Sequence, residues 1–346
     1  MIFYLTQFAM VGGTAWLYTY GKNKHISVAA KWFCFLLLFV PSAIRYGIGT
    51  DYVNYLDIFN RIKAGGSYHP KEFGWEILNI FAGKFALPFQ FVIAFASFFT
   101  ILPFFKTEIK HFFIIIVLFS CLYYLNSFNI TRQVLAMSIL WYAYLNLLKK
   151  EYINAYVLVF LAAAFHNYAL IFFVVFIAAQ FLPLNKKRIL IIFLVFVASY
   201  FVVTKYLVPI FISFVYPGVT HEFYTENNIS ILATVKSIPR FLVLGFIVFF
   251  INEEQNEKRE LNYVYWLVLG LAISDLLGVS FLMFQRIRIY FFMAYLAAFK
   301  ILILNTDIKE KIAKLVFISF IIANYLVRFL WIGSAEVIPY ATIFAK

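Results

Sequence analysis

Long apolar segments, separated by polar connections, run along almost the whole chain. A bilayer core of about 30 Å needs roughly twenty helical residues per crossing, so these segments predict membrane-spanning helices. They lie at about 2–20, 27–43, 77–105, 111–126, 130–148, 152–165, 168–184, 188–206, 238–252, 261–280, 287–304 and 313–333. The pattern predicts an all-α, polytopic membrane protein with about twelve spans. We expect a single transmembrane domain over residues 1–346.

Two stretches do not have the length of one crossing. Residues 152–184 lie between basic clusters, so they should cross an even number of times, as two short spans that meet at His166. A single kinked span is the alternative, and it would invert every later loop. Residues 77–105 are long for one span and contain Lys84 and Pro88, and we expect one kinked or tilted span there. Two spans are the alternative, which would move the N-terminus to the other side of the membrane.

Two polar sections, at about 44–76 and 207–237, are long enough to fold over one face of the helical bundle. The basic residues of the other connections gather on the opposite side if there are twelve spans. Because basic residues favour the cytoplasmic side of a membrane, the two long sections and both termini are expected to face outward.

Composition agrees with the membrane pattern and excludes a soluble protein. The 346 residues are 64% hydrophobic and 13% charged, whereas about a quarter of a soluble domain is charged. The net charge of +13 lies in clusters that flank apolar segments, so we expect contact with membrane lipids and not with nucleic acid. Cys34 and Cys121 lie inside apolar segments and indicate no disulfide framework.

Polar residues other than the cytoplasmic flanks collect at the outer ends of the predicted spans. Several are arginines, although a charge at membrane depth costs about 2.5–3.5 kcal/mol on insertion scales. The planar guanidinium group suits two-point contacts with phosphate. The sequence therefore predicts an anion site on the outer face. The arginines that we assign to it are Arg45, Arg132, Arg286 and Arg288.

Helix starts strengthen this assignment. Arg132 follows Asn129 at the start of the fifth span, and Arg286 and Arg288 stand similarly at the start of the eleventh. A helix N-terminus adds backbone N–H groups to the positive charge. We expect only one of Arg286 and Arg288 to face inward. For Arg132 the alternative is that its side chain extends to the lipid headgroups without binding a substrate. The residues expected to support the site are Tyr55, Gln133, Arg240 and Tyr290.

Three side chains are candidates for proton transfer, and the sequence does not choose among them. Asp51 precedes a predicted helix through Tyr55, where a plain N-cap is the alternative role. Glu72 shares one helix face with Glu76, and a structural role is equally open for it. His166 lies at the shallow junction of two short spans and could act as a base or as a cation. No His or Cys pair has ligand spacing, so we expect no metal site.

Sequence motifs resemble one protein family. The pattern RxGxGTDYxxYxxxF at 45–59, followed by KEFGWEILN at 71–79, resembles the start of the EpsG family. That family groups exopolysaccharide-synthesis proteins with Wzy-type O-antigen and capsule polymerases. NITRQVLAMSI at 129–139, AAAFHNYALI at 162–171 and RIRIYF at 286–291 are similar to its later motifs, in family order.

The resemblance implies a GT-C-like polymerase of the bacterial inner membrane. Such a protein would transfer a glycan from undecaprenyl diphosphate to another lipid-linked repeat unit on the periplasmic side. The arginines named above would bind the diphosphate, with Asp51 or His166 near the acceptor hydroxyl. The resemblance implies no metal or other cofactor. The expected partners are lipid-linked oligosaccharides, membrane lipids and a chain-length regulator.

Two other classes of function compete with a polymerase. A flippase or transporter would place charges along a translocation path and would often show two matching halves. No such halves are visible in the sequence, and the charges gather on one side, which favours an enzyme. A lipid-linked O-antigen ligase or a membrane acyltransferase is the second alternative. An acyltransferase would also use one intramembrane histidine, but it would not need several outer arginines.

Overall fold

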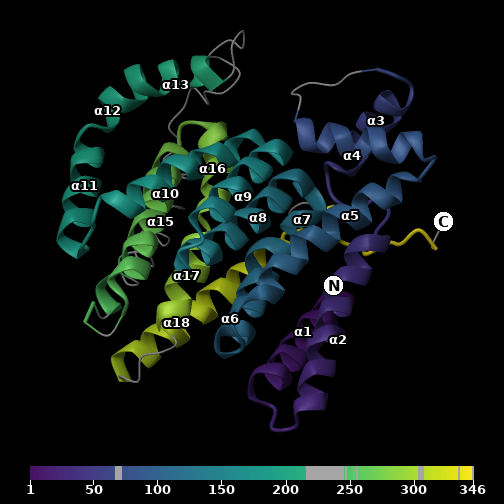
Figure 1. Cartoon of the computed structure of the whole chain (residues 1–346), viewed down its shortest axis with the longest axis horizontal. Helices are drawn as coiled ribbons and strands as arrows, with labels where there is room; N and C mark the ends of the chain where they lie inside the picture. Colours follow the sequence, from purple (N-terminus) through teal and green to yellow (C-terminus); the bar gives the residue numbers. More distant parts are fainter. Residues whose placement is uncertain are drawn as a thin grey trace. The chain divides into compact units, whose positions relative to one another are not determined.

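The computed structural model describes residues 1–66, 72–215, 245, 248–251, 253–254, 256–302, 308–333 and 336–344. Regular structure in these ranges is helical, apart from isolated β-bridge residues, which include the antiparallel pair Arg45 and Thr342 (Figure 1). The predicted all-α class is therefore confirmed. The chain packs as two compact units, Met1–Phe173 with Val316–Lys346, and Val174–Leu315. The prediction of one transmembrane domain stays a prediction.

The first unit is built around one long buried helix, α8. Its helices are α1 (Ile2–Tyr20), α2 (Lys24–Ile44), α3 (Tyr52–Lys63), α4 (Phe73–Lys84), α5 (Phe89–Ile101), η1 (Leu102–Lys106), α6 (Ile109–Phe119), η2 (Ser120–Tyr124), α7 (Asn126–Asn129), α8 (Thr131–Leu148), α9 (Tyr152–Phe165) and η3 (Asn167–Leu170). Helix α8 packs against α5 and α9, while α1 packs against α2 and α6 (Figure 1). Residues on all sides of α8 are buried, as expected for a helix that is apolar around its circumference.

Helix α15 is the buried helix of the second unit. α10 (Ile171–Phe181) leads into this unit, and α18 (Ile308–Tyr325) leads out of it to η6 (Leu326–Trp331). Between them lie α11 (Lys186–Ala198), α12 (Tyr200–Val202), η4 (Val203–Leu207), α13 (Val208–Val215), α15 (Lys258–Leu277), α16 (Leu282–Phe291) and α17 (Met293–Leu302). α15 packs against α11, α16 and α17. Gly270 permits close packing on α16, because a Cβ atom there would lie 2.2 Å from the ring of Phe291.

Several helices have the length and composition of membrane spans. Four stretches of the described chain meet both criteria unaided, namely Lys24–Ile44, Phe89–Lys106, Lys258–Leu277 and Leu282–Leu302. Shorter apolar helices lie at Ile109–Tyr124, Tyr152–Phe165, Asn167–Phe181 and Leu315–Trp331. The chain is thus a helical membrane protein, while the number of twelve spans and the GT-C-like arrangement stay predictions.

The chain reverses direction at His166, as the even-crossing argument predicts. α9 ends at Phe165, and the ring of Phe173 at the start of α10 lies 5.3 Å from Tyr156 and 5.4 Å from Phe160. In a continuous helix, Tyr156 and Phe173 would be about 25 Å apart. The alternative of one kinked span is therefore excluded.

The stretch 77–105, expected to be one kinked or tilted span, is divided into two helices, and the number of times it crosses the membrane stays a prediction. α4 ends at Lys84 and α5 begins at Phe89, with a break between them. Ala86 in this break has a positive φ of 52°, and Pro88 stands at the N-cap position of α5. A proline lacks the N–H that a continuous helix needs and disfavours a helical residue before it. Only Phe89–Lys106 of this stretch has span length.

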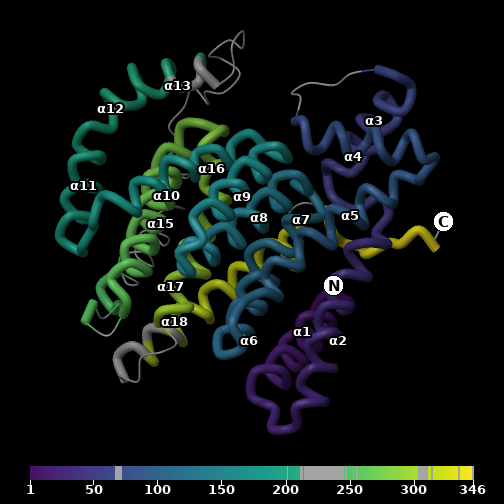
Figure 2. The backbone as a smooth tube through the Cα atoms, in the orientation of Figure 1, coloured from purple at the N-terminus to yellow at the C-terminus, as the bar shows by residue number. Residues whose placement is uncertain are grey.

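The C-terminal segment 336–344 holds the polar section that follows α2. The Tyr46 N–H donates to the Ala341 carbonyl at 3.1 Å, and the Gly49 N–H donates to the Glu336 carbonyl at 3.2 Å. Figure 2 shows this yellow segment passing the end of α2. The tail therefore helps to fix the loop that leads to α3, a role that its sequence does not signal.

Candidate functional site

An ion pair joins two of the predicted site residues. Glu72, at the N-cap position of α4, and Arg132, in the first turn of α8, lie 2.5 Å apart between Oε2 and Nη1. The side chains are 4% and 17% exposed. The guanidinium carbon of Arg132 also lies 5.4 Å from the ring centroid of Tyr55. We call Asp51, Tyr55, Glu72, Asn129 and Arg132 the Arg132 site.

Tyr55 forms the inner wall of this site. It lies on α3, it is 4% exposed, and its ring centroid is 5.3 Å from that of Trp75 on α4. Burial raises the pKa of Tyr55, and the charge of Arg132 together with hydrogen bonds from its side chain and backbone lowers it in part. Because Tyr55 bonds the first turn of α8, it fixes the position of Arg132 as well as that of the helix start.

Asn129 attaches the Asp51 loop to the start of α8. Its Oδ1 accepts hydrogen bonds from the Asp51 N–H, at 3.0 Å, and from the Thr50 hydroxyl. Asp51 occupies the N-cap position of α3, but its side chain makes no capping hydrogen bond. The structure therefore does not show the plain N-cap role. Asn129 belongs to the motif at 129–139 but not to the predicted site, and its role becomes visible only in the fold.

Gly49 allows this loop to approach α7 closely. Its φ is +94°, and a Cβ atom there would lie 2.4 Å from the Phe128 carbonyl oxygen. Gly47 also has a positive φ, of +63°, but a Cβ atom there would have no neighbouring heavy atom within 4 Å in the described chain. The first glycine of the motif thus serves the turn, while the second serves both the turn and the contact.

Packing of α4 against α9 brings the helix end that carries His166 towards the Arg132 site. A Cβ atom on Gly74, two residues after Glu72, would lie 3.1 Å from the carbonyl oxygen of Ala164, two residues before His166. This close approach brings together the helix ends that carry Glu72 and His166. His166 is half-buried between α9 and η3, with its ring centroid 5.1 Å from that of Tyr168.

Arg45 lies inside the protein and not on the open surface that we expect for a diphosphate ligand. Its side chain is buried, with Nη1 donating to the Ser42 carbonyl at 2.8 Å. Its Nη2 donates to the Thr131 hydroxyl at 3.0 Å and to the Ser127 carbonyl at 3.3 Å. Arg45 thereby links the end of α2 to α7 and to the start of α8.

The hydrogen-bond partners of Arg45 in the described chain are neutral oxygens. One of them, the Ser42 carbonyl, lies in the last turn of α2, where the helix dipole favours a cation. Burial lowers the pKa of Arg45 to about 10, so the guanidinium stays charged at neutral pH. A buried positive charge therefore lies directly behind Thr131, the residue before Arg132.

In the second unit the structure separates the roles of Arg286 and Arg288. Arg288 pairs with buried Asp275 at 2.8 Å, while Arg286 is exposed, so one arginine faces inward as predicted. The expected helix start is wrong, because α16 begins at Leu282 and Arg288 lies in its last turn. The anion site predicted at these two arginines, which needs the free N–H groups of a helix N-terminus, is therefore not formed.

Three other residues are predicted to support the site. Gln133 and Tyr290 are buried on α8 and α16, whereas Arg240 lies outside the described residues. Within the described chain, no group of three or more His, Cys, Asp or Glu side chains is placed to hold a metal ion.

An apolar groove of about 320 Å³ runs beside the Arg132 site between α5, α8 and α9. Leu135 and Ile139 of α8 form its buried floor, and exposed Phe99 and Leu161 line its outer side. Leu135 is one helical turn from Arg132, and Phe165, which also lines the groove, directly precedes His166. The groove therefore begins where the polar site ends.

Comparison with known proteins gives one match. The sequence model of the EpsG family matches residues 29–342, which is nearly the whole chain. Searches of curated proteins and of solved structures found no match. The first four motif stretches of the sequence lie in the first unit, and the stretch at 286–291 lies in the second.

Proposed function

The chain belongs to the EpsG family, and we propose that it is a polysaccharide polymerase. In this proposal it transfers a glycan from undecaprenyl diphosphate to another undecaprenyl-diphosphate-linked repeat unit, with no metal. The observation that carries the proposal is the convergence of Asp51, Tyr55, Glu72 and Arg132 at the start of α8. We place the protein in the bacterial inner membrane, with the Arg132 site towards the periplasm.

Arg132 is the proposed ligand of the leaving diphosphate. A guanidinium group carries several N–H donors in one plane, so the Nη1 contact with Glu72 is compatible with a second contact to phosphate. Buried Arg45 adds positive potential from behind the start of α8 without touching the ligand. Both charges are fixed before the reaction, and such prepared charge stabilises a developing anion.

Asp51 is the proposed general base. Its carboxylate would accept the proton of the acceptor hydroxyl as the new bond from that oxygen to the sugar C1 forms. The bond from C1 to the phosphate oxygen breaks, and its electron pair leaves with the undecaprenyl diphosphate. Glu72 is assigned to holding Arg132, because the two are paired. His166 is assigned to contact with the acceptor.

The apolar groove is the proposed place of the prenyl chain. It begins one turn from Arg132 and opens past exposed Phe99 and Leu161, so a diphosphate at Arg132 could keep its lipid tail in the bilayer. The tail is apolar in the bilayer and in the groove alike, so the groove gains little hydrophobic free energy and serves to orient the lipid through packing contacts, without involving the reacting atoms.

The test of this function is the polymer made by cells that lack the gene. A polymerase predicts loss of the long-chain ladder, with single lipid-linked repeat units retained on the outer face of the membrane, and recovery on complementation. Accumulation of repeat units in the cytoplasmic leaflet would instead identify a flippase, and an unchanged ladder would contradict the proposal.

A further inference from the structure

One face of α15 lines two neighbouring cavities of the second unit. The residues at 258, 262, 265, 269 and 272 recur at helical spacing and form this face. The first three line a polar cavity of about 420 Å³, and the last two line an apolar groove of about 400 Å³. The face extends over about 21 Å of helix. We call the two cavities together the α15 cleft.

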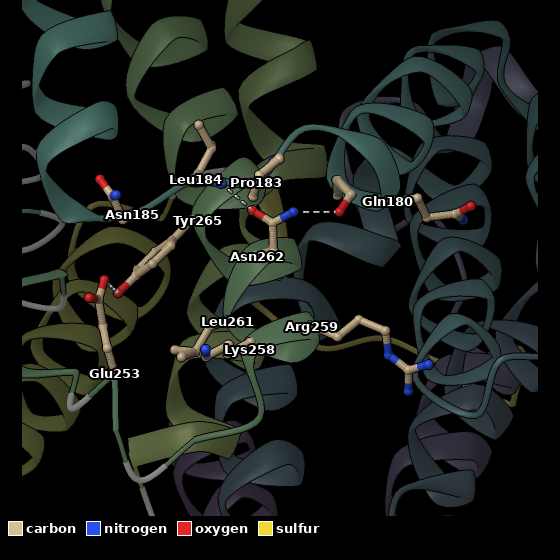
Figure 3. Close-up of a pocket in the computed structure, with 11 residues that line it drawn as sticks. Gln180, Pro183, Leu184, Asn185, Glu253, Lys258, Arg259, Leu261, Asn262 and Tyr265 are labelled. Carbon is tan, nitrogen blue, oxygen red and sulfur yellow. Dashed lines mark hydrogen bonds between the residues drawn. The ribbon is translucent and has the colours of Figure 1, made fainter.

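Hydrogen bonds fix the polar side chains that line the polar cavity. Figure 3 shows Asn262 at its centre, below the connection from α10 to α11. Asn262 Oδ1 accepts from the Leu184 N–H at 2.7 Å, and its Nδ2 donates to the Ala179 carbonyl at 2.5 Å. The Tyr265 hydroxyl donates to Glu253 at 2.7 Å. Because Asn262 bonds main-chain groups and Tyr265 bonds Glu253, these side chains shape the cavity, and recognition is left to its basic residues.

Basic side chains line both cavities. Lys258 and Arg259 line the polar cavity, and Lys186 and Lys187 line the adjoining end of the groove. Glu253 also lines the cavity, and Arg259 pairs with Glu257 at 3.5 Å, so four cations against two carboxylates leave a local charge of about +2. Lys187 and Lys258 are both exposed.

The groove beyond this basic end is apolar. Its walls are Ile189, Leu190 and Phe193 of α11, facing Leu269 and Ala272 of α15. Leu190 is 52% exposed, on a helix rich in exposed apolar residues, so this face of α11 suits contact with lipid chains. Along α11 the lining thus changes from cationic at Lys187 to apolar at Leu190 within one helical turn, and the ligand that has this order is an anionic amphiphile.

We propose that the α15 cleft binds one anionic phospholipid of the bilayer. Its phosphate lies at Lys187, its polar headgroup occupies the cavity around Asn262 and extends towards Lys258, and one acyl chain follows Leu269 and Ala272 along the groove. Basic pockets between membrane helices are a recognised form of anionic lipid site. This lipid is a resident of the surrounding membrane and takes no part in the proposed glycan transfer.

The test uses the full chain in detergent, incubated with equal amounts of dioleoyl phosphatidylglycerol and dioleoyl phosphatidylcholine. Native mass spectrometry then measures the lipid that each protein molecule retains. We expect at least fivefold more phosphatidylglycerol than phosphatidylcholine on the unmodified chain. The double variant Lys187→Gln/Lys258→Gln should lose this preference, because each basic residue contributes measurably to anionic lipid binding.

A matched variant, Lys22→Gln/Lys24→Gln, removes the same charge from exposed positions of the first unit and should keep the preference. A second variant, Ala272→Phe, fills the groove and should lower retention of phosphatidylglycerol at least fivefold. Equal retention of the two lipids by the unmodified chain would overturn the proposal, as would an unchanged preference in the Lys187/Lys258 variant. Displacement of phosphatidylglycerol by an equimolar amount of undecaprenyl phosphate would also overturn it, and would assign the cleft to the carrier lipid.

Discussion

Glu72 and Arg132 stand 60 positions apart in the sequence and form an ion pair of 2.5 Å in the fold. The carboxylate is nearly buried, and the guanidinium lies on the first turn of α8 against Tyr55. Burial restricts the Glu72 side chain, and the contact with Tyr55 restricts that of Arg132. Neither side chain can therefore move far into water when its partner is replaced. The pair therefore connects the stability of the first unit with the chemistry proposed for Arg132.

Replacement of one partner should destabilise the protein. Glu72→Gln leaves the cation of Arg132 without its carboxylate, at a cost on the order of 2–3 kcal/mol, below the upper range for buried pairs because Arg132 is 17% exposed. The double variant Glu72→Gln/Arg132→Met should recover most of the apparent melting temperature, since neither charge is then buried alone. It should make no long polymer. A Glu72→Gln variant that melts like the unmodified chain would show that the pair contributes little to folding.

The variant Asp51→Asn tests the role of Asp51 in catalysis, with little expected effect on folding. Asparagine has nearly the shape of aspartate and keeps one hydrogen-bonding oxygen, so this substitution should leave the apparent melting temperature nearly unchanged. Polymerisation should fall by about 10²–10⁴-fold, the usual contribution of a general base. Asp57→Asn is the matched control, because Asp57 is exposed on the same helix. Activity within threefold of normal in the Asp51 variant would remove Asp51 as the base and leave His166 as the candidate.

Gly49 and Gly47 provide a second matched comparison. Both have positive φ, so alanine should cost about 1 kcal/mol at either position from the backbone alone. At Gly49 the new Cβ would also lie 2.4 Å from the Phe128 carbonyl oxygen, which must move. We expect Gly49→Ala to lower the apparent melting temperature several times more than Gly47→Ala does. Equal shifts would mean that the loop does not approach α7 as described.

Apolar patterning was sufficient to predict the fold class and one topological detail. The basic flanks of 152–184 required a reversal, and the break at His166 with the Phe173–Tyr156 contact confirms it. The same patterning failed inside apolar runs, where α4 and α5 separate before Pro88 and where α16 begins ahead of Arg286. In such runs hydrophobicity continues across helix ends, so local backbone geometry decides where a helix stops.

The site was predictable as a set of residue types but not as a set of contacts. Arg132, Asp51 and Glu72 were identified because charges are costly near a membrane, and the structure gathers them at one place. Their pairing depends on how α4 packs against α9, which no local pattern encodes. Burial of Arg45 depends likewise on the carbonyls of Ser42 and Ser127, which both become its partners only in the folded chain.

The proposed orientation predicts which residues a membrane-impermeant thiol reagent reaches. Val53 is 61% exposed on α3, and Lys149 is exposed just beyond the other end of α8. Native Cys34 and Cys121 are buried, so background labelling should be low. Val53→Cys should react in intact spheroplasts, and Lys149→Cys should react only after permeabilisation. The reverse order would place the Arg132 site in the cytoplasm.

The role of Arg132 is tested most directly by the purified chain acting on an undecaprenyl-diphosphate-linked repeat unit, with product length read on a gel. Arg132→Ala is compared with Arg61→Ala, which removes an exposed arginine from α3 in the same unit. The Arg61 variant should give the normal ladder. The Arg132 variant should extend the repeat unit about 10²–10³-fold more slowly, because the leaving diphosphate loses its main charge partner. A normal ladder from a folded Arg132→Ala protein would contradict the proposed site.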